Sequence, residues 1–190
     1  MHCPVPECRK KGTGSVAAMT IHTTHPFLEP EGDRDPVRRL RGRLSGSVSL
    51  WTAGTPADRA GLTVSSWLVA GGEPGRVLAL LDPDADLTEM LLDTGRGVVQ
   101  LLQWEDRDLA DVFAGVAPAP GGPWRLAEWI ETDHGPRLAH AVTWATVSVE
   151  SDVEVGWSRL VTCTIDEVVV GEDEQQLTHR RGRYVPPARR

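Results

Sequence analysis

The sequence predicts a mainly β domain, a barrel of short strands that carries short helical insertions. Its apolar runs are short and are bounded by Gly, Pro and Asp, as in strands that are joined by turns. Only two short segments space their apolar residues as a helix does. No glycine-rich phosphate loop follows a strand with dinucleotide-binding spacing, which disfavours alternating β and α units.

The first part of the predicted barrel consists of strands separated by turns. The run 47–53 predicts a strand, and the Gly, Pro and Asp residues of 54–60 predict the turn after it. Residues 61–70 contain β-branched residues and serines, and we expect them to form one continuous second strand. The wholly apolar run 77–81 predicts a short buried strand.

Helical insertions and further strands follow. Apolar residues at i, i+3 and i+4 predict a helix over 87–93, which Thr94-Gly95 ends, and a second helix over 107–114. The remaining predicted strands cover 98–102, 140–150 and 159–170.

Bulk composition narrows the class of function. The chain has 190 residues, a net charge of -7 and a pI near 5.3, which disfavours nucleic-acid binding as the main role. Arginines cluster at 34–43 and 180–190, and such clusters usually belong to solvated segments. No apolar run is long enough to span a membrane, and no signal peptide is recognisable. We therefore expect a cytoplasmic protein.

The first 35 residues differ in composition from the rest. They are rich in Pro, Gly, Thr and charge without strand or helix periodicity, so we expect a flexible extension before a domain over 36–190. Met19 is a candidate natural start. A zinc-finger-like spacing is also present, but its histidines are too close together, and we expect no metal site. That spacing consists of Cys3, Cys8, His22 and His25.

One segment, Gly61 to Ser66, carries hydroxyl groups on both faces of its predicted strand. Such a strand fills neither a core nor a surface efficiently. Hydroxyl groups and free backbone N–H groups at a strand edge bind a phosphate or the polar rim of a flavin ring, and Gly61 permits a close approach of a ligand to the backbone. A serine- and threonine-rich strand that binds nothing explains the same residues, so both readings remain open.

The order of the motifs resembles that of the flavin reductase-like family. The resemblance covers about residues 37–185, and its strength is the combination of motifs in consistent order, because no single motif is unique to the family. In chain order the similar stretches are Trp51-Thr52-Ala53, Gly61-Leu62-Thr63-Val64-Ser65-Ser66, Pro74, Val77 to Leu81, Asp82-Pro83-Asp84, Thr94-Gly95-Arg96-Gly97-Val98-Val99, Arg107 to Gly115, and Leu177-Thr178-His179-Arg180-Arg181-Gly182-Arg183-Tyr184.

The resemblance implies a Greek-key split β-barrel that forms a homodimer and binds FMN, or in some members FAD. Leu62 to Ser66 would then lie along the flavin, and Arg96 would lie near its phosphate, for which a guanidinium has suitable charge and donors. The cofactor-binding residues implied by the resemblance are Leu62, Thr63, Val64, Ser65, Ser66, Leu81, Asp82, Pro83 and Arg96.

Two departures from the family pattern bear on function. Ala85-Asp86 replaces a serine-containing phosphate turn, and Asp86 would repel a phosphate unless it turned away or capped the following helix. Many active members carry an Asp-His pair where this chain has Val155 to Arg159, without a histidine. From this stretch Trp157, which can stack on a ring, and Arg159, which can bind a pyrophosphate, are candidates for the nicotinamide side. His179 is a third candidate because the closing motif would approach the flavin, and a solvent-facing histidine is the alternative.

The resulting functional prediction is an oxidoreductase of the flavin reductase type. It would transfer hydride from NAD(P)H to FMN or FAD and supply reduced flavin to a partner such as a flavin-dependent monooxygenase. The alternative is a flavin-binding carrier or redox protein without efficient NAD(P)H turnover, which the missing Asp-His pair favours. A ligand-free barrel that acts as an interaction module is a third reading, compatible with Ala85-Asp86.

Overall fold

The computed structural model describes residues 35–172 and 175–187. The chain divides into two units, Met1–Arg39 and Leu40–Arg190. Of the first unit, only residues 35–39 are described, and helix α1 (Pro36–Arg41) begins among them. The expected N-terminal extension, apart from residue 35, and the cysteine and histidine spacing within it lie outside the described residues.

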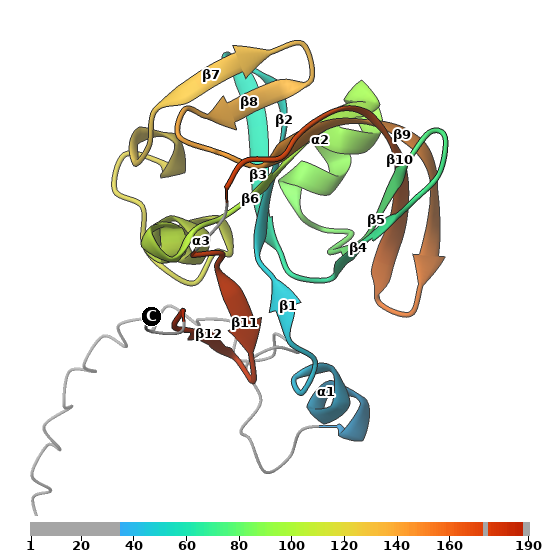
Figure 1. The fold of residues 1–190 in the computed structure, drawn as a ribbon, viewed down its shortest axis with the longest axis vertical. Helices are drawn as coiled ribbons and strands as arrows, with labels where there is room; N and C mark the ends of the chain where they lie inside the picture. The colour runs from blue at the N-terminus through green and yellow to red at the C-terminus, as the bar shows by residue number, and fades with distance from the viewer. Residues whose placement is uncertain (1–34, 173–174, 188–190) are drawn as a thin grey trace, which may run out of the picture. The chain divides into compact units, whose positions relative to one another are not determined.

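One antiparallel seven-stranded sheet forms the body of the second unit (Figure 1). Its two edge strands follow one another in the chain with only Ser65 and Ser66 between them. A sheet whose opposite edges are joined by two residues must curl back on itself. Beside this joint the Leu80 N–H donates to the Ser66 carbonyl at 2.9 Å, which continues the pairing of residues 67–70 with 76–79. In order, the strands are β3 (Asp58–Val64), β2 (Ser49–Thr55), β6 (Arg96–Leu101), β9 (Trp144–Val155), β10 (Ser158–Val169), β5 (Arg76–Leu81) and β4 (Trp67–Ala70).

Side chains alternate between the two faces of each strand, and those on the inner face fill the interior of this curled sheet. On β5, Val77, Ala79 and Leu81 are buried inside, whereas Leu80 faces outward. Helix α2 (Asp86–Thr94) packs against β2 and β3 and buries Leu87 and Leu91 in the same core (Figure 1). The expectation of a mainly β fold with short helical insertions is confirmed.

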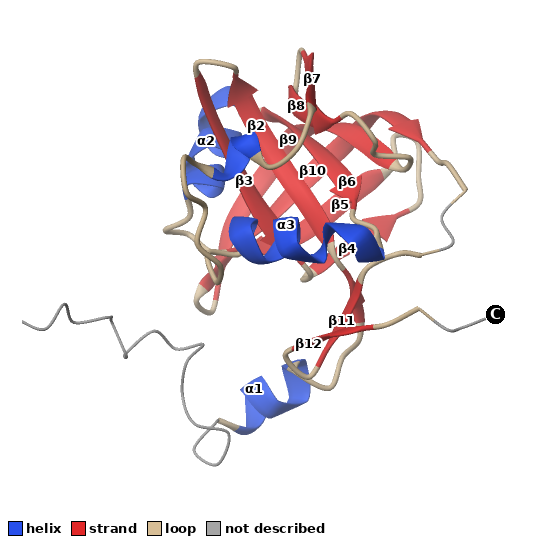
Figure 2. Ribbon diagram, turned by 90° about the vertical axis from the view of Figure 1, so that its left-hand side faces the viewer, coloured by secondary structure: helices blue, strands red, loops and turns tan. Residues whose placement is uncertain are grey.

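A second core lies on the outer side of β2 and β3, under helix α3 (Arg107–Phe113), which follows the 3-10 helix η1 (Trp104–Asp106) (Figure 2). Phe113 contacts Trp124 and Trp129 edge-to-face, with ring centroids 5.1 and 5.9 Å apart. Trp124 belongs to the 3-10 helix η2 (Pro123–Arg125). This aromatic cluster fixes α3 against β3.

Two small sheets were not expected from the sequence. Strands β7 (Trp129–Thr132) and β8 (Gly135–Leu138) form a hairpin, which the buried Gln100 fastens to the main sheet because its Oε1 accepts from the Leu138 N–H at 2.7 Å. Strands β1 (Gly46–Ser47), β11 (Thr178–Arg180) and β12 (Arg183–Val185) form the other.

Some predicted boundaries are wrong. The single strand expected over 61–70 is two strands, because the chain passes from one edge of the main sheet to the other at Ser65-Ser66. The strand expected over 140–150 begins at Trp144 and continues to Val155, where it turns into β10. No helix within the described ranges is long and apolar enough to cross a membrane.

Candidate flavin site

Thr63 and Val64, two residues of the expected flavin segment, both contact other parts of the protein: Thr63 is half-buried and Val64 is buried. The Thr63 hydroxyl donates to the Ala110 carbonyl of α3 at 2.8 Å. Val64 is buried in the interior of the curled sheet, and Leu62 packs against the same core. The hydroxyl run therefore does not act as one surface, and Thr63 has a structural partner that sequence reasoning did not identify.

Gly61 makes room for a side chain of the protein itself. A Cβ at this position would lie 2.7 Å from Cε1 of Phe113 and 3.3 Å from Cη2 of Trp124. Real Cβ atoms essentially never approach other atoms as closely as the first of these distances. The close approach expected of a ligand at Gly61 is made here by the Phe113 ring, which corrects the sequence-based interpretation of this glycine.

Ser65 is exposed and Ser66 is half-buried, and these two residues form the link between β3 and β4. The Ser66 hydroxyl accepts from Nη2 of Arg41 at 3.0 Å. The Ser65 carbonyl lies against Gly46, where a Cβ would be only 2.8 Å from its oxygen. These contacts fix the link while leaving the Ser65 side chain exposed.

Leu81, Asp82 and Pro83 follow the strand beside this link. Leu81 is buried and pairs with Arg159 of β10. The Asp82 carboxylate accepts from the Asp84 N–H at 3.0 Å, and the Asp82 carbonyl accepts from the Thr88 hydroxyl at 2.6 Å. Because Leu80 bonds to Ser66, the structure brings Ser66 and Leu81 close together.

Asp86 does not cap helix α2. The N-cap is Ala85, without a side-chain cap hydrogen bond, and Asp86 is the first helical residue. A carboxylate in the first turn is favourable to the helix dipole, but it offers a phosphate no donor. The turn after β5 thus supplies negative charge where the related pattern has a hydroxyl group.

Arg96 lies apart from the Ser65-Ser66 link. Arg96 is the first residue of β6 and pairs with Ser148. The other end of β6 lies nearer the serines, because Leu101 pairs with Ser49 and Ser49 pairs with Val64, the residue before Ser65. Five residues along a strand correspond to about 17 Å. The structure therefore does not bring Arg96 to the two serines.

The three residues expected on the nicotinamide side occupy different places. Trp157 is 81% exposed in the turn between β9 and β10. Arg159 lies beside Leu81, its Nη2 donates to the Asp152 carboxylate, and its Nε is buried without a hydrogen-bond partner. His179, on β11, pairs with Gly46 and so lies near Ser65.

The surroundings of His179 include groups that the sequence did not single out. Burial lowers the pKa of His179, the positive charge of Arg41 lowers it further, and Asp111 opposes both effects. The rings of Tyr184 and His179 meet edge-to-face with their centroids 5.9 Å apart, and the Tyr184 hydroxyl donates to the Asp111 carboxylate at 2.7 Å. Burial, followed by this bond, raises the pKa of Tyr184. Arg41 is 25 residues from Ser66 in the sequence, so no local spacing marks their contact.

Comparison with known proteins decides the family. The model of the flavin reductase like domain matches residues 41–188 of this chain. The chain belongs to the flavin reductase-like family.

Relatives of this flavin reductase-like protein share about a quarter of its residues. It is 26% identical over 158 residues to FMN reductase (NADH) RutF of Stutzerimonas stutzeri, covering 83% of this chain and 90% of the relative. It is 26% identical over 154 residues to the reductase component of 4-nitrophenol 4-monooxygenase/4-nitrocatechol 2-monooxygenase of Rhodococcus opacus, covering 80% of each.

Solved structures share the fold. NADH:FAD oxidoreductase SgcE6 of Streptomyces globisporus C-1027 matches with a TM-score of 0.73 at 20% identity, over 86% of this chain and 92% of that one. Flavin reductase PheA2 in its native state matches with a TM-score of 0.72 at 20% identity, over 80% and 97% respectively.

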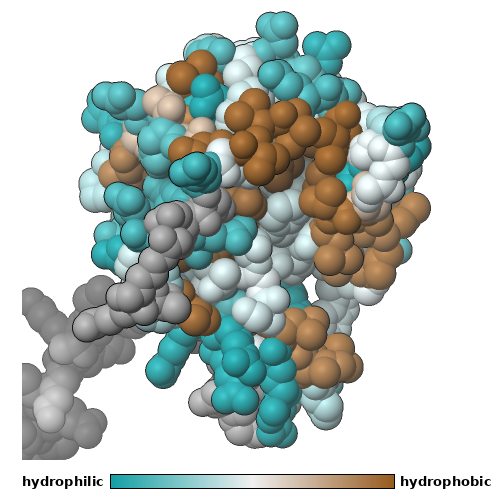
Figure 3. All heavy atoms as spheres, viewed as in Figure 1, coloured by the Kyte–Doolittle hydropathy of each residue, from teal (hydrophilic) through white to brown (hydrophobic). Residues whose placement is uncertain are grey.

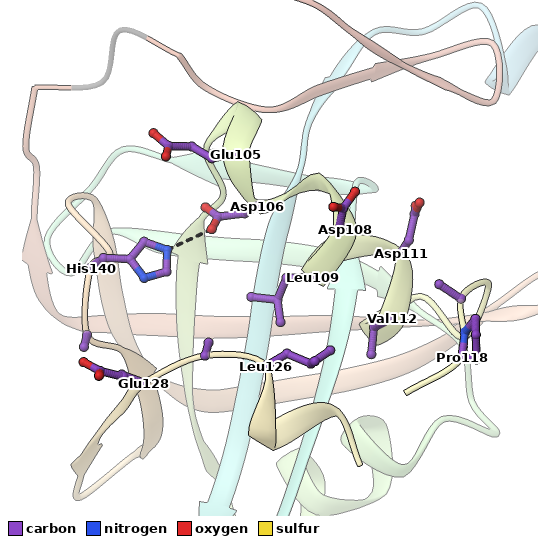
Figure 4. A pocket seen from close by; sticks show the side chains of 13 residues that line it. Glu105, Asp106, Asp108, Leu109, Asp111, Val112, Pro118, Leu126, Glu128 and His140 are labelled. Atoms are coloured by element: carbon purple, nitrogen blue, oxygen red, sulfur yellow. Dashed lines mark hydrogen bonds and ion pairs between the residues drawn. The ribbon is translucent and has the colours of Figure 1, made fainter. Parts of the chain in front are cut away.

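An acidic cavity of about 690 Å³ adjoins α3 in this flavin reductase-like domain (Figure 4). Its lining combines apolar side chains, among them Leu109 and Leu126, with several carboxylates. The His140 Nε2 is 2.8 Å from the Asp106 carboxylate. A phosphate group would be repelled by this set of carboxylates, so the cavity does not suit the flavin phosphate. The carboxylates belong to Glu105, Asp106, Asp108, Asp111 and Glu128.

Proposed function

We propose that this protein is an NAD(P)H-dependent flavin reductase that binds FMN, or FAD, and supplies reduced flavin to a partner flavin-dependent monooxygenase. The observation that carries the proposal is the match of the family model to residues 41–188. The relatives add to it, because they are named FMN reductase (NADH) or reductase components of monooxygenases. A bound flavin would supply the redox chemistry by accepting a hydride.

The residues around the Ser65-Ser66 link fit a flavin. Ser65 offers an exposed hydroxyl, Ser66 is held by Arg41, and the adjacent Leu80 presents apolar surface for a ring. Leu81, Asp82 and Pro83 follow directly, and Arg159 lies beside Leu81. In this proposal Val64 supports the wall from the interior of the sheet and Thr63 ties it to α3. Direct contact of either residue with the flavin stays a prediction, as does the phosphate role of Arg96.

A homodimer is part of the proposal, and an apolar outer surface supports it. Leu68, Leu80 and Val153 are 73%, 41% and 53% exposed, and they share the outer face of β4, β5 and β9. Brown, apolar atoms gather in Figure 3 on the side where Figure 1 shows these strands. Apolar patches of this kind on soluble proteins usually mark interfaces. A homodimeric split barrel of residues 36–190 in the cytoplasm is the complete proposal.

The dimer is tested by sedimentation of the wild type and of Val153→Glu. We expect the wild type to sediment as a dimer and the variant as a monomer, because a buried unpaired carboxylate opposes association. Thr164→Glu serves as the control and should remain dimeric. Thr164 is half-buried on the neighbouring strand β10 and pairs with Ser148. A monomeric wild type would remove this part of the proposal.

The second candidate function is a flavin carrier without efficient NAD(P)H turnover. The observation that favours it is the β9–β10 turn, which presents Trp157 and has no histidine. An assay of NADH and NADPH oxidation with FMN, FAD and riboflavin, alongside flavin titrations, separates the two candidates. Flavin-dependent oxidation supports the reductase, and tight binding without oxidation supports the carrier. Neither binding nor oxidation would remove both.

A further inference from the structure

Three donor groups from distant parts of the chain meet at the Ser65-Ser66 link. Arg41, the last residue of α1, donates from Nη2 to the Ser66 hydroxyl at 3.0 Å. His179 of β11 pairs with Gly46, and Gly46 lies directly against the Ser65 carbonyl. The guanidinium and the hydroxyl thus meet at one short link that also bonds to β5, the backbone of His179 lies beside it, and the charge of Arg41 reaches the His179 imidazole.

We propose that Arg41, Ser66 and His179 form a subsite for a phosphate ester. The proposal rests on the flavin reductase function and assigns part of the site a specific ligand chemistry. The Ser66 oxygen accepts from Arg41, so its own proton remains free to be donated to a phosphate oxygen. A guanidinium has several donors and a fixed positive charge, which suit phosphate oxygens. The phosphate belongs either to the flavin or to the nicotinamide dinucleotide.

The charges around His179 predict a proton linkage. From α1, Arg41 opposes protonation of the imidazole, and from α3, Asp111 favours it. From β12, the neutral Tyr184 hydroxyl donates to Asp111, and Asp108 lies near enough to Tyr184 to influence its pKa. A phosphate next to Arg41 and His179 would offset the repulsion between them and raise the pKa of His179. Binding of the ligand should therefore be accompanied by proton uptake.

The contrast with the cavity beside α3 supports the choice of ligand. That cavity presents five carboxylates, whereas the Ser65-Ser66 link presents donors and positive charge. Asp111 borders both, but its Oδ1 accepts from Tyr184. Electrostatics thus favours an anion at the serine link over one in the cavity.

The test compares FMN with riboflavin, which lacks the phosphate, in the full-length protein. Arg41→Gln should weaken FMN binding about ten- to a hundredfold, the usual effect of losing a charge-assisted hydrogen bond, and leave riboflavin binding unchanged. If the phosphate is that of the dinucleotide, the same change leaves both flavin affinities unchanged and raises KM for NADH with riboflavin as acceptor. Arg43→Gln, an exposed arginine two residues away, is the matched control and should change neither quantity.

Further variants and calorimetry keep the result interpretable. Arg41→Lys retains the charge and should recover part of the affinity, and Ser66→Ala should weaken the same ligand. Calorimetric titration in buffers of different ionisation enthalpy should show proton uptake with the affected ligand, which His179→Asn abolishes. Equal effects of Arg41→Gln and Arg43→Gln, or unchanged FMN affinity together with unchanged KM for NADH, would overturn the subsite. Failure of the wild type to bind any flavin would instead overturn the proposed function.

Discussion

Replacing Gly61 with alanine tests whether this glycine makes room for the Phe113 ring. The new Cβ would lie 2.7 and 2.9 Å from two carbons of that ring. Carbon atoms prefer separations of about 3.5–4.0 Å, so the ring must move by about 1 Å. Trp124 and Trp129 hold the ring on its other sides, and such overpacking typically costs about 1–3 kcal/mol.

The assay is urea unfolding followed by tryptophan fluorescence. We expect Gly61→Ala to lower the free energy of unfolding by about 1–3 kcal/mol with little change in the dependence on urea. Gly71→Ala is the control, because its Cβ meets no atom within 4 Å, and it should stay within about 0.5 kcal/mol of the wild type. In a Phe113→Leu background the effect of Gly61→Ala should shrink, since the two sites are coupled.

The contrary result for Gly61 is equally specific. If Gly61→Ala unfolds like the wild type but binds flavin more weakly, then Gly61 serves a ligand and the assignment to Phe113 is mistaken.

Three further predictions follow from buried groups. Gln100→Leu leaves the buried Leu138 N–H without its acceptor, so the free energy of unfolding measured in urea should fall by about 1–3 kcal/mol. A variant as stable as the wild type would show that this bond is dispensable. Burial, aided by Asp166, raises the pKa of the Cys163 thiol to about 12. Peptide mapping should therefore find Cys163 unlabelled by a thiol reagent at about pH 8 until urea unfolds the protein. Rapid labelling of the native protein would contradict the burial of this thiol. The pKa of His179 is lower in the folded than in the unfolded protein, so the protein loses stability as the pH falls through the ordinary histidine pKa of 6.5. The midpoint temperature of thermal unfolding should therefore fall less with decreasing pH in His179→Gln than in the wild type. Parallel plots of midpoint against pH for the two proteins would refute this linkage.

The fold class was predictable from the sequence because short apolar runs and turn residues are local signals. The strand at 77–81 was found in this way and corresponds to β5. The break at Ser65-Ser66 was not predictable, because no Gly or Pro marks it and the passage between sheet edges causes it. The β7–β8 hairpin depends on Gln100, 38 residues away from its partner Leu138.

The candidate site shows the same limit. Ser65 and Ser66 were expected at the site, and the structure leaves them accessible beside Leu80 and Leu81. Helix α3, however, uses the Thr63 hydroxyl, and this contact spans 47 residues of sequence. Periodicity and spacing do not report which distant element will use a given hydroxyl group.

The most direct test of the central claim, reduction of flavin by NAD(P)H, is an anaerobic reaction of the purified protein with FMN and NADH. Without oxygen to reoxidise the flavin, its visible absorbance reports reduction directly. We predict that the absorbance disappears at a rate proportional to the protein concentration, with one FMN reduced per NADH consumed. An absorbance that declines no faster than in the protein-free control, with NADH or with NADPH and while the protein remains folded, would contradict the flavin reductase function.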